Sequence, residues 1–270
     1  MQRGISMKVN FGSVAKNYAQ YRNDLPMEVM ESLKHRGIDF TNKKVADLGS
    51  GTGVLSRALH DEGAVVVGVE PSAELIEQAK ELDKSEGQVI EYMNTCAEST
   101  TLNEGLFDYV TVLRAWHWFN REKTLAEIKR LLSGKGKLIV MDSGFISNRK
   151  VIADTLQIIK ANMPGGELRP AGDKAQSKQF INGFPVEWFK EWQEHGFDLK
   201  ETYKFHYDVS FSNEDWCGRV GSLSWLSGFT EKRRNEILHE ILTHIGKEYG
   251  EIQHTIQHGC YITILNQSYS

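Results

Sequence analysis

Val45-Ala46-Asp47-Leu48-Gly49-Ser50-Gly51-Thr52-Gly53 places a short, mostly apolar run directly before three glycines with GxGxG spacing. Helical spacing of apolar residues returns in 54–59. Glycines between a strand and a helix are typical of a ligand-binding turn, because they tolerate positive φ and let a ligand approach the backbone. The dinucleotide fingerprint is GxGxxG, and Val54 stands where its third glycine would fall. The spacing therefore argues against a pyrophosphate ligand.

Strand and helix patterns alternate outward from this turn. Besides 45–48, short apolar runs predict strands at 64–69, 88–93, 107–113 and 136–141. Between them, helical patterns cover 54–59, 71–80 and 123–132. This alternation predicts right-handed crossovers and an α/β fold with a doubly wound, mostly parallel sheet. Ligands of such sheets bind outside the carboxyl ends of the strands, so we look for function after strands one to four.

The flanking segments predict more helices and two further strands. A helix is expected at 26–33, which opens with Pro26. After Asp142 the expected helices are 149–162, 186–195, 213–228 and 231–249, with a loop-like stretch at 163–183. Strands at 200–211 and 260–266 bring the sheet to seven. We expect 143–198 and 212–257 to be insertions that cover the ligand crevice.

Composition narrows the class of protein. The chain has 270 residues, of which 40% are hydrophobic and 25% charged, as in ordinary globular proteins. Its formal net charge of −4 predicts no nucleic-acid partner. Three separate cysteines without a CxxC pair argue against a zinc knuckle or disulfide framework. No membrane span and no signal-peptide core are visible, so a cytoplasmic setting is expected.

Histidines do not predict a metal site. His254 and His258 are four residues apart, but Thr255 stands where an HExxH motif needs glutamate. We therefore expect no metal.

Glu70 closes the second predicted strand, twenty-one residues after Gly49. A carboxylate at that place can accept both hydroxyls of an adenosine ribose and would repel a 2′-phosphate. The alternative is a solvated acid at a strand end.

Several motifs together resemble a class I S-adenosylmethionine-dependent methyltransferase. They are Val45–Gly53, Gly68-Val69-Glu70-Pro71-Ser72, Ala97-Glu98, Phe107-Asp108 and Trp116-His117-Trp118-Phe119. Within that superfamily the chain is most similar to the small-molecule branch of trans-aconitate methyltransferase-like enzymes, over about Phe11 to Asp142. The resemblance implies a Rossmann-like methyltransferase fold, S-adenosylmethionine as cofactor, S-adenosylhomocysteine as product and a small-molecule acceptor.

The resemblance also implies which residues bind the cofactor. It places the methionine part against the glycine motif, the ribose diol on Glu70 and the adenine beside Pro71-Ser72 and Ala97-Glu98. Leu113 and Arg114 are expected to touch cofactor or acceptor. The full expected set is Tyr18, Arg22, Asp47, Gly49, Ser50, Gly51, Gly53, Glu70, Pro71, Ser72, Ala97, Glu98, Leu113 and Arg114.

Tyr18 and Arg22 match an N-terminal aromatic and arginine that clamp the cofactor's carboxylate in this branch. A guanidinium suits that task because it binds a carboxylate through two parallel hydrogen bonds. The resemblance thus implies a helical lid at 1–40, a cofactor-binding core at 41–143, and the rest of the sheet with helical insertions at 144–270. The alternative for Tyr18 and Arg22 is a surface helix.

Aromatic residues after the fourth strand point to the acceptor site. Aromatic walls suit a sulfonium by cation–π attraction. Between Trp116 and Trp118, His117 is either a general base, since its ordinary pKa of about 6.5 lies near working pH, or a packing residue. Trp225 and Arg219 complete the expected acceptor residues, with Arg114 and Arg219 as anion anchors. A small organic acid is the first guess, with a phenol or nitrogen heterocycle next.

Other residues and other classes stay open. Trp188, Phe189 and Trp192 at helical spacing favour core packing over a substrate box. A methyltransferase acting on tRNA or protein would want a basic face or an added module. A nicotinamide oxidoreductase conflicts with the GxGxG spacing, and no Tyr-x-x-x-Lys pair follows the fourth strand. A cofactor-binding protein without catalysis is the remaining alternative.

Overall fold

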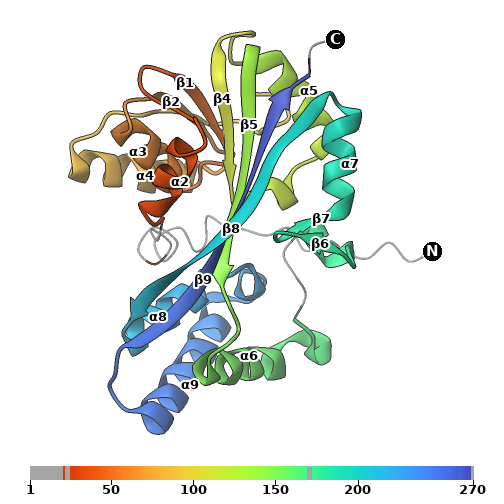
Figure 1. The fold of residues 1–270 in the computed structure, drawn as a ribbon. Coiled ribbons are helices and arrows are strands. Elements are labelled where there is room, and N and C mark those ends of the chain that lie inside the picture. Colours follow the sequence, from red (N-terminus) through yellow and green to blue (C-terminus); the bar gives the residue numbers. More distant parts are fainter. Residues whose placement is uncertain (1–20, 22–24, 169–171, 269–270) are drawn as a thin grey trace.

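A computed structural model describes residue 21 and residues 25–168 and 172–268. The expected clamp residues Tyr18 and Arg22 lie outside this part of the chain. A seven-stranded sheet forms the centre of the molecule, with strand order β3-β2-β1-β4-β5-β9-β8 (Figure 1). The predicted doubly wound, mostly parallel sheet of seven strands is confirmed.

Five parallel strands form one half of the sheet and two long strands the other. The parallel strands are β1 (Lys44–Leu48), β2 (Val65–Val69), β3 (Glu91–Met93), β4 (Phe107–Leu113) and β5 (Leu132–Phe145). Strand β9 (His254–Gln267) runs antiparallel to β5, and β8 (Phe197–Phe211) runs antiparallel to β9. The apolar strands β1 and β4 are buried because they are covered on both faces.

Helices cover both faces of the sheet. Helices α2 (Glu28–Lys34), α3 (Val54–Asp61) and α4 (Ala73–Glu86) pack one face in a core with side chains of β1, β2 and β5. Helices α5 (Arg121–Leu131) and α7 (Val186–Glu194) pack the other. Trp188 and Trp192 on α7 are 2% and 1% exposed, so the expected core role of this aromatic helix is confirmed.

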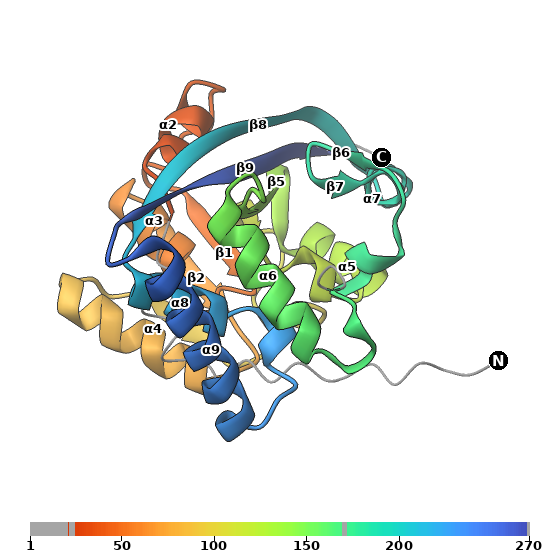
Figure 2. The same cartoon turned by 90° about the horizontal axis from the view of Figure 1, so that it is seen from below.

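A third core lies at the far ends of β8 and β9. It is built by α6 (Lys150–Asn162), α8 (Asn213–Gly221) and α9 (Glu231–Tyr249), which lie together in Figure 2. Both long strands extend from the main sheet to this lower group of helices. The segments expected as insertions therefore share one continuous sheet with the glycine-turn region.

Several expected boundaries were wrong. The helix expected at 213–228 ends at Gly221, and a short 3₁₀ turn, η5 (Ser224–Leu226), follows. The Ser222 hydroxyl donates to the Arg219 carbonyl, a local bond that replaces the next helical one. Strand β3 is shorter than 88–93, whereas β5 and β9 extend beyond 136–141 and 260–266. The division at 143 stays a prediction, although β5 runs across it.

The expected loop at 163–183 contains structure of its own. It holds the 3₁₀ turns η3 (Pro164–Gly166) and η4 (Gly172–Gln176), and the hairpin β6 (Phe180–Ile181) and β7 (Phe184–Pro185) begins within it. In the part of the chain that the structure describes, no helix is both long and apolar enough to cross a bilayer.

Candidate active site

A cavity of about 270 Å³ opens at the carboxyl ends of β1, β2, β4 and β5. Its position agrees with the rule for ligands of parallel sheets. Segments far apart in the sequence enclose it, because η4 and η5 contribute walls opposite the strand ends. The lining residues are Gly49, Gly51, Glu70, Pro71, Leu75, Leu113, Arg114, Ala115, His117, Trp118, Phe119, Asp142, Ser143, Lys174, Leu223, Ser224 and Trp225.

The turn after β1 needs its glycines. Gly49, Gly51 and Gly53 have φ of 70°, 57° and 78°, which side chains other than glycine rarely adopt. A Cβ on Gly49 would lie 2.5 Å from the Ala115 Cβ, and one on Gly53 would lie 2.3 Å from the Tyr92 hydroxyl oxygen. The turn is therefore packed closely on both sides, and its backbone forms part of the cavity wall.

Glu70 is buried at the end of β2 and faces this turn. One carboxylate oxygen accepts from the Gly51 N–H at 3.1 Å and the other from the Ser72 N–H at 2.9 Å. A carboxylate has about four lone-pair directions, so each oxygen keeps one for a ligand. Burial raises the pKa of Glu70, and the two N–H bonds oppose that rise. The geometry suits a carboxylate that receives two hydroxyl donors.

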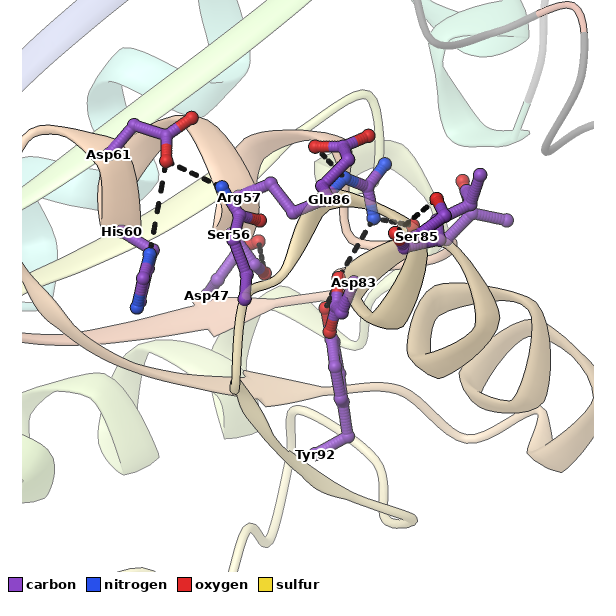
Figure 3. Close-up of polar contacts among 12 residues, drawn as sticks. Asp47, Ser56, Arg57, His60, Asp61, Asp83, Ser85, Glu86 and Tyr92 are labelled. Carbon is purple, nitrogen blue, oxygen red and sulfur yellow. Dashed lines mark hydrogen bonds and ion pairs between the residues drawn. The ribbon is translucent and has the colours of Figure 1, made fainter.

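Asp47 lies beneath the turn and does not line the main cavity. Its carboxylate accepts from the Ser56 hydroxyl at 2.6 Å (Figure 3). It also accepts from the Thr111 hydroxyl at 3.1 Å. Burial raises the pKa of Asp47 to about 7, although both hydroxyl bonds lower it. It shares a small adjoining hollow with Ser50 and Thr52. Its contacts support the turn from below.

The segment after β4 packs against the glycine turn and also lines the cavity. Arg114 has a φ of 58°, unusual for a side-chain-bearing residue, and its Nε donates to the Ser143 hydroxyl at 2.7 Å. His117, Trp118 and Phe119 also line the cavity. A strained backbone at a cavity wall is one of the places where function concentrates.

An ion pair closes the β5 end of the cavity. The Lys174 ammonium on η4 binds the Asp142 carboxylate at the carboxyl end of β5. Burial would raise the pKa of Asp142, but the charges of Lys174, His117 and Arg114 hold it below its ordinary value. The cations around Asp142 therefore favour its charged form.

The η4 segment is held over His117. A Cβ on Gly172 would lie 2.1 Å from the His117 carbonyl oxygen, so the backbones touch there. Beside it, Arg121 binds both Asp173 of η4 and Glu191 of α7. These contacts hold η4 at the cavity, which its Lys174 lines.

Nine of the residues expected to bind cofactor or acceptor line the cavity together. They are Gly49, Gly51, Glu70, Pro71, Leu113, Arg114, His117, Trp118 and Trp225. Four others, Asp47, Ser50, Gly53 and Ser72, support or adjoin the turn and Glu70.

The structure does not bring the remaining four to the cavity. Trp116 is 2% exposed and packs edge-to-face against Phe119 and tilted against Trp192, so it belongs to the core. Ala97 is buried in the same core. Glu98 accepts from the Asn120 N–H at the start of α5 instead.

Arg219 is the fourth. It is fully buried within α8, among the residues of the lower helical group, and does not line the cavity. Of the two expected anion anchors, Arg114 lines the cavity and Arg219 does not.

Sequence reasoning missed Asp142, Ser143 and Lys174. A signal existed for the first two, because they follow the apolar run 138–141 and so mark the end of strand five. Lys174 carried no such signal, since only the tertiary fold brings η4 over the cavity. Among residues 25–168 and 172–268, no three His, Cys, Asp or Glu side chains gather as a metal site would need.

Comparisons with known proteins bear directly on this arrangement. A family model for a methyltransferase domain matches residues 46–140, which hold β1 to β5 and the glycine turn. A ubiquinone biosynthesis O-methyltransferase of Histophilus somni is 32% identical over 211 residues, covering 75% of this chain and 84% of that protein. The chain belongs to the class I methyltransferase family.

Other relatives agree with this family over shorter or more distant matches. A methyltransferase of Dictyostelium discoideum is 34% identical over 139 residues, and the match spans about half of each protein, 50% of this chain and 49% of that one. A Haemonchus contortus phosphoethanolamine N-methyltransferase, solved with phosphomonomethylethanolamine and S-adenosylhomocysteine, shares the fold with a TM-score of 0.54. Its identity is 14%, and the match covers 97% of this chain and 61% of that one.

Proposed function

We propose that this methyltransferase uses S-adenosylmethionine to methylate a small-molecule acceptor inside the cavity. The observation that carries the proposal is the buried Glu70 carboxylate, which faces the glycine turn with one lone pair on each oxygen left for a ribose hydroxyl. The Haemonchus neighbour, solved with S-adenosylhomocysteine, supports the same cofactor.

The residues around Glu70 fit the other parts of that cofactor. Pro71, Leu75 and Phe119 offer apolar walls for an adenine ring. Gly49 and Gly51 line the cavity without a side chain of their own, which suits close approach of the amino-acid end to the backbone. The proposed clamp by Tyr18 and Arg22 would add to this binding.

Catalysis then depends mainly on alignment. The cofactor supplies an activated methyl group, so the protein needs little covalent chemistry of its own. Trp118, Trp225 and η4 enclose the space beside the turn. Enclosure holds the acceptor in line and excludes water, which is where such an enzyme gains rate.

The charges at the β5 end favour an acidic acceptor. Among the described residues that line this end, Arg114 and Lys174 are cations and Asp142 is the carboxylate. The trans-aconitate-like resemblance likewise implies a small organic acid. The Histophilus relative, named as a ubiquinone biosynthesis O-methyltransferase, favours oxygen as the acceptor atom. A phenol therefore stays a candidate beside the acid.

Methyl transfer from labelled cofactor to a panel of small acids, phenols and amines, with bulk tRNA and protein in parallel, tests the proposal. We expect label on a small molecule. Strong label on tRNA or protein, with none on the panel, would replace the small acceptor by a macromolecule. Cofactor binding with no transfer to any of these would favour the non-catalytic alternative.

His117→Ala separates the acceptor classes. An acid is already ionised, so the loss of rate should stay below about tenfold, whereas a neutral hydroxyl or amine that needs a base should lose about a hundredfold or more. Steady-state rates on the active panel member measure this loss.

A further inference from the structure

A buried ion pair between Arg57 and Asp83 (Figure 3) contacts the glycine turn from outside the cavity. The Arg57 guanidinium of α3 binds the Asp83 carboxylate of α4 at 3.1 Å, and their side chains are only 4% and 5% exposed. Neither residue lines the cavity. The ion pair is therefore not part of the cavity wall.

The pair touches the turn through backbone. The same Arg57 Nη1 that binds Asp83 also donates to the Thr52 carbonyl at 2.8 Å. A Cβ on Gly53 would lie 3.0 Å from this nitrogen. The Thr52 carbonyl is thus bound by Arg57, which lies outside the cavity, and the Gly51 N–H is bound by Glu70, which lines it.

Two further side chains fix Arg57 in place. Its Nε lies 3.5 Å from a carboxylate oxygen of Glu86, one turn beyond Asp83 on α4. The Tyr92 hydroxyl of β3 donates to Asp83 at 3.3 Å and also packs against Gly53. Burial and the Asp83 charge raise the pKa of Tyr92, so its hydroxyl stays a donor. Elements α3, α4 and β3 thereby converge on one turn.

Buried ion pairs are a poor means of stabilising a fold. Removing two charges from water costs several kcal/mol per ion, and apolar replacements of similar volume are often as stable or more so. Aliphatic side chains would fill this space but would leave the Thr52 carbonyl without its donor. The guanidinium of Arg57 is therefore needed to hold the Thr52 carbonyl in position.

We infer that Arg57 is a positioning residue that holds the glycine turn in its cofactor-binding geometry, with Asp83 and Tyr92 holding Arg57. The inference rests on the proposed function, in which this turn receives the cofactor. Arg57 acts through the Thr52 backbone and touches neither cofactor nor acceptor. Without it the turn samples other conformations, and the apparent cofactor affinity falls by the fraction of molecules that remain competent.

The test compares cofactor affinity with stability. Arg57→Met combined with Asp83→Asn removes both charges and keeps an oxygen that accepts from Tyr92. Calorimetry with S-adenosylhomocysteine should show affinity about tenfold weaker, the result of a turn competent about one-tenth of the time. The urea midpoint should change little, because the desolvation cost of the ion pair that is removed offsets the hydrogen bond that the Thr52 carbonyl loses. Arg233→Met with Glu236→Leu removes an exposed ion pair and is the charge-matched control, expected to change neither.

Amide hydrogen exchange distinguishes a positioning role of Arg57 from a general contribution to the stability of the fold. Faster exchange confined to residues 50–53, with β4 unchanged, is expected. Affinity within twofold of wild type together with unchanged exchange at the turn overturns the inference, and so does faster exchange spread evenly over β4 and β5.

Arg57→Lys keeps the test decisive if the double variant does not fold. It retains the charge for Asp83, but a compact ammonium cannot bridge Thr52 and Asp83 as the guanidinium does. We expect the same local exchange at 50–53, and its absence contradicts the inference. If wild-type protein does not bind S-adenosylhomocysteine, the proposed function fails, while the exchange data still decide the role of Arg57.

Discussion

At the scale of single residues, two buried carboxylates beside the same turn have different tasks. Glu70 keeps lone pairs toward the cavity, whereas the Asp47 oxygens accept hydrogen bonds from Ser56 and Thr111 below the turn. Both carry a raised pKa because both are buried. Burial therefore does not distinguish the two acids. Their hydrogen-bond partners do: those of Glu70 leave it facing the cavity, and those of Asp47 make it a support of the turn.

Glu70→Ala should weaken S-adenosylhomocysteine binding by about 2–3 kcal/mol, the scale of hydrogen bonds to a charged group. The loss follows because the ribose hydroxyls have no other carboxylate among the residues that line this part of the cavity. Calorimetry measures it, with Glu74→Ala on the exposed first turn of α4 as control. Tighter binding of NAD than of S-adenosylhomocysteine by wild type would contradict the assignment.

Asp47 should make stability depend on pH. Its folded pKa of about 7 lies above the ordinary 3.8, so between these values the folded state binds more protons than the unfolded one. Stability from this group is therefore full below pH 4 and is lost as pH rises to 7. Asp47→Asn removes the ionisation. The free energy of unfolding of the variant minus that of wild type should therefore increase across this window by at most about 4 kcal/mol.

Urea unfolding of both proteins at pH 4.5, 6 and 7.5 measures that difference. Comparing the two at each pH cancels the titrating groups that do not interact with Asp47; Glu70, whose charge helps to raise the Asp47 pKa, is not among them. A difference that stays constant with pH would show that Asp47 does not titrate in this range.

At the scale of elements, the glycine turn joins β1 to α3 and is held by α4, β2 and β3. Sequence alone predicted β1, the turn and Glu70, because apolar runs, glycine spacing and a strand-end acid are local signals. It could not predict Lys174 or the Arg57–Asp83 pair. Those contacts depend on how η4, α3 and α4 pack, and no spacing in the sequence encodes that packing.

Gly53→Ala should damage this element more than an equally strained substitution elsewhere. Gly53 and Gly87 have φ of 78° and 73°, so alanine pays about 1–2 kcal/mol of backbone strain at either place. Only at Gly53 does the new Cβ meet Tyr92 and Arg57, while Gly87 has open space. Affinity for S-adenosylhomocysteine should fall about tenfold or more in Gly53→Ala, as the competent turn is depopulated, and hold in Gly87→Ala.

Thermal melts of both glycine variants, beside the titrations, separate the two effects. Gly53→Ala should melt below Gly87→Ala, because only its new Cβ clashes, and it alone should lose affinity. Equal loss of affinity in the two variants would mean that general strain, and not the shape of the turn, controls binding.

At the scale of the whole molecule, strand order explains why distant segments meet. The connection reverses between β1 and β4, so the ends of β1, β2, β4 and β5 converge at one crevice. The alternation of strands and helices predicted this convergence. For η4 and η5, which complete the cavity wall, the sequence predicted only that insertions lie there. Their local sequence fits a loop or a longer helix, so the two turns themselves were not predicted.

The account as a whole makes the cavity beside Glu70 a cofactor site. A crystal structure of the protein with S-adenosylhomocysteine tests this most directly. We predict the ribose hydroxyls on the Glu70 carboxylate, the amino-acid end against Gly49 and Gly51, and the sulfur facing the space between His117 and Trp225. Density for the ligand elsewhere, or in the cavity with its ribose away from Glu70, would contradict the account.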